Sequence, residues 1–375
     1  MTVDTLPTPC FVVDTGKLDA NVARMAARAE ALGVALRPHG KTPKCAEFGR
    51  KLANGAGLCT STLLEAERYF AAGIKDLFYA VALSPAKAAR AARLIADGAA
   101  LTCLIDDPDG LAGIAAAARV ADVRIPLLIE IAADDYRSGV GLEGPDLLRL
   151  AEAVAEQDRL DLVGVMSYGG ASYTCRPEEA AALAERHRIA LLEAAERLRG
   201  AGHAIKTLSF GSTPAVLYAA GLEGVTEIRC GIYAFQDLFQ AAIGACAIED
   251  IAGSVLTEVI SRQPRNNRFV IDAGALALSK DRSTAATAFD SGFGRICDAA
   301  SGALIGDLFV AFTSQELGLV TSLSGAPIPM DAFPVGRRLR VLPNHADMTA
   351  AAYDAYHLVN ARGEVTGRLE RFNGW

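Results

Sequence analysis

Short apolar runs alternate with alanine-rich helical stretches from Val34 to Cys230. The helical stretches include Ser84–Ala96, Leu147–Glu156 and Pro177–Arg199. Eight strands that alternate with helices predict a (β/α)8 barrel, since a doubly wound open sheet rarely contains so many regular units. We therefore expect an α/β fold with a TIM-type barrel over residues 14–245. The apolar runs are Val34–Leu36, Gly57–Cys59, Leu77–Ala80, Leu101–Ile105, Leu127–Ile131, Leu162–Met166, Thr207–Phe210 and Glu227–Cys230.

The pattern changes after Ala245, where helical periodicity is largely lost. β-prone runs follow, separated by turns rich in Gly, Pro and Asp, and they predict a separate all-β domain over residues 246–375. A β-prone segment within residues 1–13 could add a strand to it, and Asp14 or Thr15 could cap the helix that follows. The C-terminal runs are Ile251–Arg262, Arg268–Asp272, Leu308–Phe312, Arg338–Leu342 and Tyr356–Val359.

The overall composition limits the class of protein. A chain of 375 residues suits two domains, and a net charge of −7 argues against a nucleic-acid partner. The eight cysteines form no CxxC pair, which favours reduced thiols over disulfides or a zinc knuckle. No targeting segment and no uncharged apolar run of membrane length is visible. We expect a cytoplasmic protein that binds neither nucleic acid nor membrane.

The segment VALRPHGKTPK, Val34–Lys44, carries the first chemical signal. In an extended strand, Arg37, His39 and Lys41 would lie on one face, and Gly40 would allow close approach to the backbone. One interpretation is a strand that runs into a solvated basic turn. The other is a lysine whose amine is kept reactive by neighbouring cations and partial desolvation, as a Schiff-base lysine requires.

Further polar residues follow the other predicted strands, and the active site of such a barrel lies at these C-terminal strand ends. The Gly-Ser-Thr-Pro segment predicts a helix start whose N–H groups suit a phosphate, although Ser and Thr also serve as simple helix caps. A lysine and a phosphate cup at one barrel mouth suggest pyridoxal phosphate. The candidates are His39 and Lys41, Arg137, Tyr168, Gly211-Ser212-Thr213-Pro214, and Arg229, Gly231 and Tyr233.

The β-rich part contains the sequence Pro-Asn-His-Ala-Asp. His345 and Asp347 would share a face of a strand and could ligate a divalent metal, or they could simply form a surface hydrogen bond. Two protein ligands would leave coordination positions for water and substrate. The other histidines carry less signal. We expect His187 and His203 to be solvated on arginine-rich helical surface, and His357 to contribute to packing.

Several motifs together resemble the D-threonine aldolase and D-serine dehydratase family. They are RPHGKTPK, the Arg-Ser-Gly-Val turn at Arg137, GSTP, EIRCGIYAF, DAGALALSKDR and LPNHADMT. This family comprises fold-type III pyridoxal phosphate enzymes related to alanine racemase. The resemblance covers nearly the whole chain and implies a homodimer with pyridoxal phosphate and a divalent metal.

The resemblance also implies a role for each matching residue. Lys41 would hold the cofactor through a Schiff base with His39 and Arg37 as supports, while Lys44 would be structural. His345 and Asp347 would hold the metal, which could be Mn²⁺, Mg²⁺ or Zn²⁺. The remaining cofactor contacts would be Arg137 at the phenolic oxygen, Tyr168 beside the ring, Arg229 facing the ring nitrogen, and Gly211, Ser212, Thr213, Gly231 and Tyr233 around the phosphate.

The chain mixes the marks of the family's two main activities. The segments GSTP, ALSKDR and LPNHA resemble the dehydratases that act on D-serine or D-threo-3-hydroxyaspartate. Asp347 matches the residue that the aldolases have at this position, whereas such dehydratases usually have cysteine there. Tyr168 also matches the residue of the aldolases. Leu317 replaces a histidine frequent across the family, and another aldolase histidine has no clear match among Ala171–Thr174.

Our first hypothesis is a metal-assisted cleavage of a D-3-hydroxy amino acid to glycine and an aldehyde. Lys41, Tyr168 and Tyr173 are its candidate catalytic residues, and the base could be Tyr173 or a hydroxide on the metal. The alternative is β-elimination to a 2-oxo acid and ammonia, in which Lys41 removes the α-proton. Racemisation and non-catalytic carriage of pyridoxal phosphate are further alternatives, and the long β-rich part argues against a carrier.

Overall fold

The computed structural model describes residues 2–134 and 137–375, which divide into two compact units. One comprises Met25–Gly231 with Gly374–Trp375, and the other comprises Met1–Arg24 with Ile232–Asn373. These bounds differ from the expected ranges 14–245 and 246–375. Helix α1 (Thr15–Ala31) explains part of the difference. The amide of Asn21, in its first half, donates to the backbone oxygens of Ala234 at 3.3 Å and Asp250 at 2.8 Å.

The first unit contains an eight-stranded parallel sheet in the order β2-β9-β8-β7-β6-β5-β4-β3. A further parallel bridge between His39, after β2, and Cys59 in β3 joins the two ends of this sheet. The predicted barrel of parallel strands is therefore confirmed. The strands are β2 (Ala35–Leu36), β3 (Leu58–Thr60), β4 (Asp76–Ala82), β5 (Ala100–Ile105), β6 (Ile125–Glu130), β7 (Leu160–Tyr168), β8 (Thr207–Gly211) and β9 (Glu227–Arg229).

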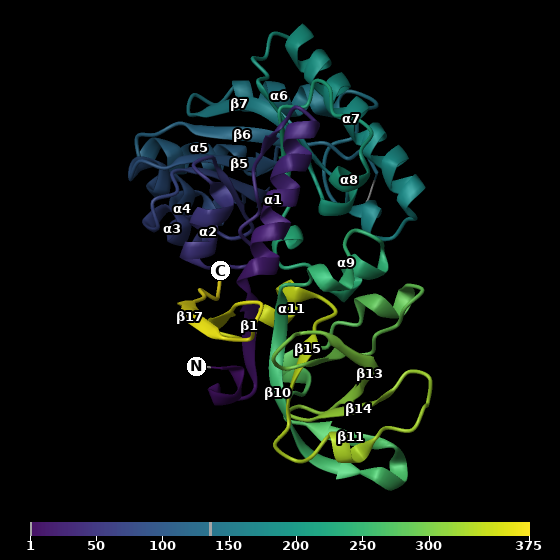
Figure 1. The fold of residues 1–375 in the computed structure, drawn as a ribbon. Coiled ribbons are helices and arrows are strands. Elements are labelled where there is room, and N and C mark those ends of the chain that lie inside the picture. Colours follow the sequence, from purple (N-terminus) through teal and green to yellow (C-terminus); the bar gives the residue numbers. More distant parts are fainter. Residues whose placement is uncertain (1, 135–136) are drawn as a thin grey trace. The chain divides into compact units, whose positions relative to one another are not determined.

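Helices connect these strands, as the sequence predicted (Figure 1). They are α2 (Ala46–Ala53), α3 (Leu63–Ala71), α4 (Pro85–Ala96), α5 (Leu111–Val120), α6 (Asp146–Ala155), α7 (Pro177–Gly200) and α8 (Thr213–Tyr218). Consecutive strands from β3 to β7 each contribute one side chain to a buried apolar cluster: Cys59, Phe78, Leu104, Leu128 and Met166. Among the described residues, none of the helices combines the length and apolar composition that a membrane span requires.

The second unit is built on a nine-stranded sheet in the order β11-β14-β13-β12-β15-β10-β1-β16-β17. An additional pairing of β10 with β11 closes the strands from β11 to β10 into an antiparallel ring. The predicted all-β domain is thus confirmed. The strands are β1 (Cys10–Asp14), β10 (Gly253–Gln263), β11 (Arg268–Ile271), β12 (Arg295–Asp298), β13 (Leu304–Thr313), β14 (Gly318–Ser322), β15 (Arg338–Leu342), β16 (Ala355–Val359) and β17 (Val365–Glu370).

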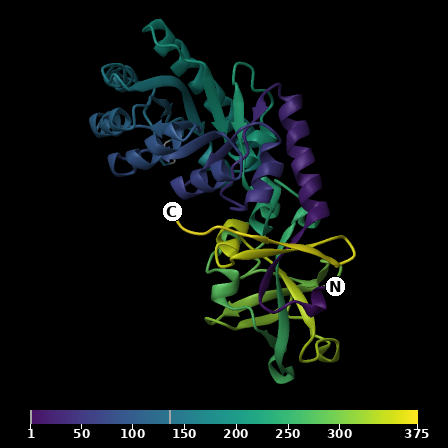
Figure 2. The same ribbon diagram turned by 90° about the vertical axis from the view of Figure 1, so that its left-hand side faces the viewer.

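Strand β1 extends this sheet beyond the ring. It pairs antiparallel with β10 and parallel with β16, so the N-terminal segment (purple) and the C-terminal hairpin (yellow) lie side by side in Figure 2. At the end of β1, the carboxylate of Asp14 accepts a hydrogen bond from the backbone N–H of Lys17 at 3.1 Å and caps α1. Three strands were missed because their apolar runs are short or interrupted, namely β12, β14 and β17.

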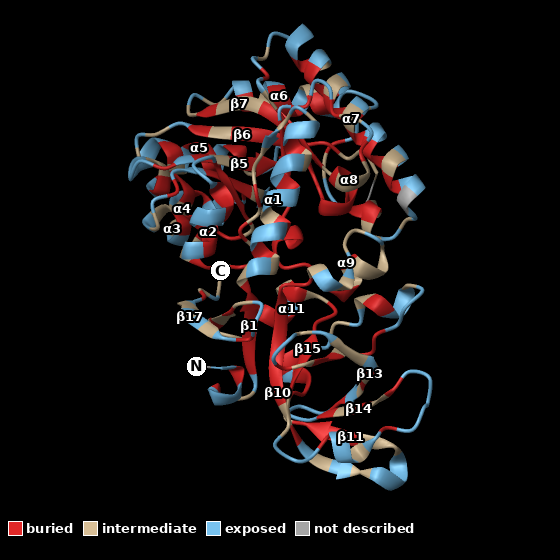
Figure 3. Cartoon of the chain, viewed as in Figure 1, coloured by how far each residue is buried: buried red, intermediate tan, exposed pale blue. Residues whose placement is uncertain are grey.

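Buried residues, red in Figure 3, concentrate on the strands in both units. In the β-rich unit, Phe11 on β1 is fully buried. Its ring centroid lies 6.1 Å from that of Phe235, 5.6 Å from that of Tyr353 and 5.4 Å from that of Tyr356. The N-terminal strand is therefore held by aromatic packing as well as by backbone pairing.

Replacing Phe11 by alanine should lower the free energy of unfolding by about 3–5 kcal/mol, because it leaves a cavity among these three aromatic rings. Urea unfolding followed by circular dichroism would measure the loss. Phe289→Ala is the control, because that side chain is 71% exposed and its removal should change stability by less than about 0.5 kcal/mol. Equal effects of the two substitutions would contradict this account of β1.

Candidate active site

Lys41 lies in a turn, and the prediction that it continues a strand is wrong. Strand β2 ends at Leu36, His39 forms an isolated bridge, and residues 40–43 make a turn in which the Lys44 N–H donates to the Gly40 oxygen at 3.0 Å. Gly40 also accepts a hydrogen bond from the Tyr69 hydroxyl at 2.7 Å. A Cβ on Gly40 would lie 2.4 Å from the Tyr69 ring, so this buried tyrosine requires glycine in the turn.

His39 lies beside Lys41 and is held neutral. Its Nδ1 is 3.4 Å from the Lys41 backbone nitrogen, and its Nε2 is 3.4 Å from the Ser61 hydroxyl. Burial lowers the pKa of His39 well below its usual value, and the positive charges of Lys41, Arg229 and Arg137 lower this pKa further. Three positively charged side chains therefore favour the neutral form of this histidine.

Arg37 does not support the Lys41 amine directly, which corrects the expectation from the sequence. Its Nε donates to Glu227 at 2.8 Å and its Nη1 to Asp76 at 2.8 Å. These carboxylates are the first residues of β9 and β4, so the Arg37 side chain reaches the starts of these strands. Although burial opposes it, the charge of Glu227 and the hydrogen bond to Asp76 raise the pKa of Arg37.

Arg229 carries a charge inside the barrel, where its side chain is 5% exposed. Its Nη1 donates to the Ser209 hydroxyl at 2.6 Å, and its Nη2 donates to the backbone oxygen of Ser167 at 2.9 Å. Ser209 in turn donates to Glu227 at 2.6 Å. A chain of contacts thus links Arg37, Glu227, Ser209 and Arg229 through the barrel, and burial lowers the pKa of Arg229.

The predicted residues after β6 and β7 contact each other. The Arg137 guanidinium lies 4.3 Å from the centroid of the Tyr168 ring, close enough for a cation–π interaction. It also donates to Glu130, the buried last residue of β6, at 3.2 Å. The Ser138 hydroxyl donates to the other oxygen of Glu130 at 2.9 Å. Glu130 therefore fixes the turn that presents Arg137 to Tyr168.

The Gly-Ser-Thr-Pro segment begins helix α8, as predicted. The Ser212 hydroxyl caps this helix by accepting from the Ala215 N–H at 3.3 Å, and it also shares a hydrogen bond with the Ser172 hydroxyl at 2.9 Å. Ser172 belongs to a short 3-10 helix, Gly170–Tyr173, which includes the candidate base Tyr173. The contact between the two serines therefore joins the candidate phosphate cup to the segment of Tyr173.

The glycines of the predicted cup sit at crowded points. A Cβ on Gly211 would lie 2.9 Å from the Arg229 backbone oxygen, and one on Gly231 would lie 3.0 Å from the His39 Cβ. Packing of the strand ends alone would thus require glycine at both positions. Tyr233 is buried in the 3-10 helix Ile232–Ala234, which belongs to the β-rich unit.

His187 on α7 is fully buried, so the expectation that it is solvated is wrong. Its Nε2 lies 3.2 Å from the Asp134 carboxylate, and its ring centroid lies 5.9 Å from that of Phe210. Asp134 also accepts a hydrogen bond from the Ala171 N–H at 3.3 Å, so it links the loop after β6 to the segment of Tyr173. Helical spacing offered a signal for His187, which continues the stripe of Ala180, Leu183, Ala184, Leu191, Ala194 and Leu198, all buried.

The metal candidates belong to the β-rich unit, and they do not lie on a strand as expected. His345 precedes helix α11 (Ala346–Ala350), and Asp347 lies in its first turn. Although burial opposes it, the hydrogen bond to Asp281 and the charge of Asp347 raise the pKa of His345 to about 9. No group of three or more His, Cys, Asp or Glu side chains arranged for a metal occurs in the part of the chain that the structure describes.

Two acidic residues near His345 were missed in the sequence. Asp281 Oδ2 lies 3.0 Å from His345 Nδ1. Asp237 is fully buried, and its carboxylate accepts from the Gln240 N–H at 2.8 Å and the Ala346 N–H at 3.0 Å. Burial raises the pKa of Asp237 to about 6. Of these two residues, only Asp281 could have been found in the sequence, because it lies in the family motif DAGALALSKDR.

Comparisons with known proteins identify the family. Residues 13–238 match the family model for the alanine racemase N-terminal domain, and residues 252–359 match that for a putative serine dehydratase domain. The whole chain is 41% identical to the D-threo-3-hydroxyaspartate dehydratase of Delftia sp. strain HT23 and covers 99% of it. The chain belongs to the D-threonine aldolase and D-serine dehydratase family of fold-type III pyridoxal phosphate enzymes. The resemblance found in the sequence is thus confirmed.

Solved structures of this family agree with the fold. The structure of the Delftia dehydratase superposes with a TM-score of 0.96, and each chain covers 100% of the other. The D-threonine aldolase of Arthrobacter sp. is 31% identical over 94% of this chain and 89% of its own length. Members with either activity thus resemble this chain over most of its length, and this dehydratase is more similar than this aldolase.

In the absence of cofactor, the contribution of His39 to the unfolding free energy should fall as the pH drops below 6.5, the ordinary pKa of histidine. Below that pH the unfolded chain binds a proton at His39 that the folded chain rejects. His39→Gln should therefore lose less stability than the wild type between pH 7 and pH 5, as measured by urea unfolding.

His187, whose pKa burial also lowers, should contribute a second part of this pH dependence. That part should remain in His39→Gln and disappear when His187→Gln is added to it. If His39→Gln loses as much stability as the wild type, then His39 is not held neutral by its surroundings.

Proposed function

We propose that this protein is a lyase that eliminates water from a D-3-hydroxy amino acid, after which water hydrolyses the resulting imine to a 2-oxo acid and ammonia. The structural observation that carries the proposal is Lys41 beside a neutral His39, in the field of Arg229 and Arg137. The choice of reaction is supported by the full-length similarity to the dehydratase. The proposal includes a homodimer in the cytoplasm that acts on a free amino acid.

The residues at the barrel mouth fit pyridoxal phosphate. Ser212 and Thr213 begin α8, and hydroxyl groups and backbone N–H groups are suitable donors for a phosphate. A Cβ at Gly231 would lie 3.0 Å from the His39 Cβ, so glycine fits this crowded position beside His39. Lys41 would bind the aldehyde, with Arg137 and Tyr168 beside the ring and Arg229 at its nitrogen.

His345 and Asp347 fit a divalent cation, because a nitrogen donor and a carboxylate two residues apart suit Mn²⁺, Mg²⁺ or Zn²⁺. One solved structure of a D-threo-3-hydroxyaspartate dehydratase, 41% identical to this chain, is a metal-free variant whose replaced cysteine lies two positions after a histidine replaced in another solved variant of a D-threo-3-hydroxyaspartate dehydratase. His345 and Asp347 have this spacing. Metal binding by that relative supports, by analogy, a metal at this pair.

When bound, pyridoxal phosphate withdraws electrons from the substrate Cα, and a divalent cation weakens the bond to the β-hydroxyl. The chain's own residues supply the proton transfer and the orientation. The Lys41 amine takes the α-proton, and neutral His39 beside it adds no further positive charge. Glu130 holds Arg137 over the Tyr168 ring, which keeps both side chains in place while the substrate reacts.

Aldol cleavage, our first hypothesis from the sequence, is the second candidate. Two residues favour it, since Asp347 and Tyr168 both resemble the aldolases. In that reaction a base such as Tyr173 would take the proton of the β-hydroxyl, and the bond between Cα and Cβ would break. The greater similarity to the dehydratase reverses the order in which we rank the two reactions.

The products distinguish the two reactions. With D-threo-3-hydroxyaspartate or D-threonine, pyridoxal phosphate and Mn²⁺, we expect a 2-oxo acid and ammonia in equal amounts, measured by chromatography and an ammonia assay. Glycine with an aldehyde would instead establish the aldolase. Conversion of a D-amino acid to its L-form without cleavage would indicate a racemase and contradict both.

Lys41→Ala should abolish the visible-edge absorbance of bound pyridoxal phosphate and reduce the rate by at least about a thousandfold, because both the Schiff base and the base at Cα are lost. Lys44→Arg is the matched control, because Lys44 lies in the same segment and pairs with Glu65 at 3.1 Å. It should keep both the band and the activity. Loss of the band in the control alone would exchange the roles of the two lysines.

A further inference from the structure

Asn344, the residue before His345, forms hydrogen bonds that hold the segment Asp281–Gly292 next to the candidate metal site. Its side-chain amide donates to the backbone oxygens of Asp281 at 3.1 Å and Gly292 at 2.6 Å, and its side-chain oxygen accepts from the Thr284 hydroxyl at 3.0 Å. Asn344 is 2% exposed. Both ends of the segment Asp281–Gly292 are thus held by the immediate neighbour of His345.

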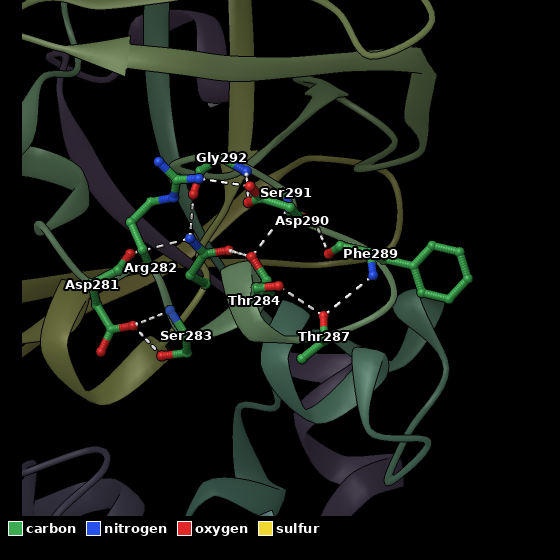
Figure 4. Close-up of polar contacts among 10 residues, drawn as sticks. Asp281, Arg282, Ser283, Thr284, Thr287, Phe289, Asp290, Ser291 and Gly292 are labelled. Atoms are coloured by element: carbon green, nitrogen blue, oxygen red, sulfur yellow. Dashed lines mark hydrogen bonds and ion pairs between the residues drawn. The ribbon is translucent and has the colours of Figure 1, made fainter. Parts of the chain in front are cut away.

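The segment is also braced internally, as Figure 4 shows. The Thr284 hydroxyl accepts from the Ser291 N–H at 3.1 Å, and the Thr287 hydroxyl donates to the Thr284 oxygen at 2.8 Å. Across the segment, Arg282 pairs with Asp290 at 2.6 Å. These bonds involve protein groups alone, so they hold the segment in shape without a ligand.

The Asp281 carboxylate is oriented by this frame. Its Oδ1 accepts from the Ser283 N–H at 2.7 Å and from the Ser283 hydroxyl. That leaves Oδ2 directed at His345, 3.0 Å from Nδ1. A carboxylate fixed through one oxygen presents the other in a defined direction, so the contact with His345 restricts the rotation of the imidazole.

We propose that Asp281 is a positioning residue that keeps the proton of His345 on Nδ1 and thereby presents Nε2 to the divalent cation. A neutral imidazole has one N–H and one acceptor nitrogen, so the carboxylate at Nδ1 decides which nitrogen can bind a metal. Carboxylates behind metal-bound histidines orient the ring and increase its basicity. The inference rests on the metal site of the proposed function.

Asp237, the second acid near His345, is fully buried and contacts the main chain. Its two carboxylate oxygens accept from the backbone N–H groups of Gln240 and Ala346. It therefore fixes the main chain just after His345, whereas Asp281 fixes the ring. Asp237 thus positions the backbone next to His345, and Asp281 positions its imidazole ring.

Asp281→Asn should weaken Mn²⁺ binding by about 10- to 100-fold, because the amide no longer favours a proton on Nδ1. Isothermal titration of the pyridoxal phosphate-loaded protein with Mn²⁺ measures this directly, without an activity assay. The visible-edge band of the cofactor should stay unchanged, which a general loss of structure would not allow. Asp307→Asn is the matched control, since it makes the same change on β13, outside the segment Asp281–Gly292, and should leave Mn²⁺ binding unchanged.

The controls separate failure of the inference from failure of the proposed function. If the wild type binds no Mn²⁺, or if His345→Ala binds it as tightly as the wild type, then the metal site itself is wrong and the inference falls with it. If His345→Ala loses the metal but Asp281→Asn keeps the wild-type affinity, then only the role of Asp281 is overturned.

A second measurement serves if Asp281→Asn does not fold. Nitrogen-15 NMR of the Zn²⁺-loaded wild type, with its five labelled histidines and His345→Gln to assign the signal, should show a proton on Nδ1 of His345. A proton on Nε2 would overturn the proposal. Ser283→Ala, which removes one of the bonds that orient Asp281, should weaken Mn²⁺ binding less than Asp281→Asn does.

Discussion

Burying the charge of Arg229 is costly, and the arrangement of the barrel interior depends on how that cost is offset. Ser209 stands between the guanidinium and Glu227, and Arg37 pairs with the same carboxylate. The carboxylates that pair with Arg37, those of Glu227 and Asp76, lie at the starts of β9 and β4. Arg229, Lys41 and Arg137 lie at or after strand ends, where Glu130 pairs with Arg137. Cations at this end of the barrel suit phosphate and carboxylate groups.

The sequence predicted the order of the elements because hydrophobic periodicity reports which side of a strand or helix is buried. It succeeded for all eight barrel strands and for β10, β11, β13, β15 and β16. It failed for β17, where Gly367 and charged residues interrupt a half-exposed strand at the sheet edge. It also failed to place Lys41 and His345, since strand alternation cannot foresee a turn or a helix start immediately after the strand ends.

The roles of single polar residues depend on contacts that are remote in the sequence. His187 and Asp134 are 53 positions apart, and Asp281 and His345 are 64 apart, as the differences of their numbers show. Family motifs therefore pointed to Lys41, Arg137 and the Gly-Ser-Thr-Pro segment as candidates, but they gave no role to the side chains that hold these residues. Residues that belong to a motif can thus be recognised in the sequence, whereas the side chains that position them can be recognised only from their contacts in the fold.

The pairing of β1 has a consequence for the order in which the protein can fold as it is synthesised. Apart from its last two residues, the barrel unit is one continuous stretch, Met25–Gly231, in which each strand from β4 to β9 pairs with the strand before it and can do so as it emerges. The first strand has both its partners, β10 and β16, in the last third of the chain. During synthesis on the ribosome, β1 therefore stays unpaired until β10 and β16 have been made. The apolar side chains of Phe11–Val13 are exposed to cellular chaperones until then.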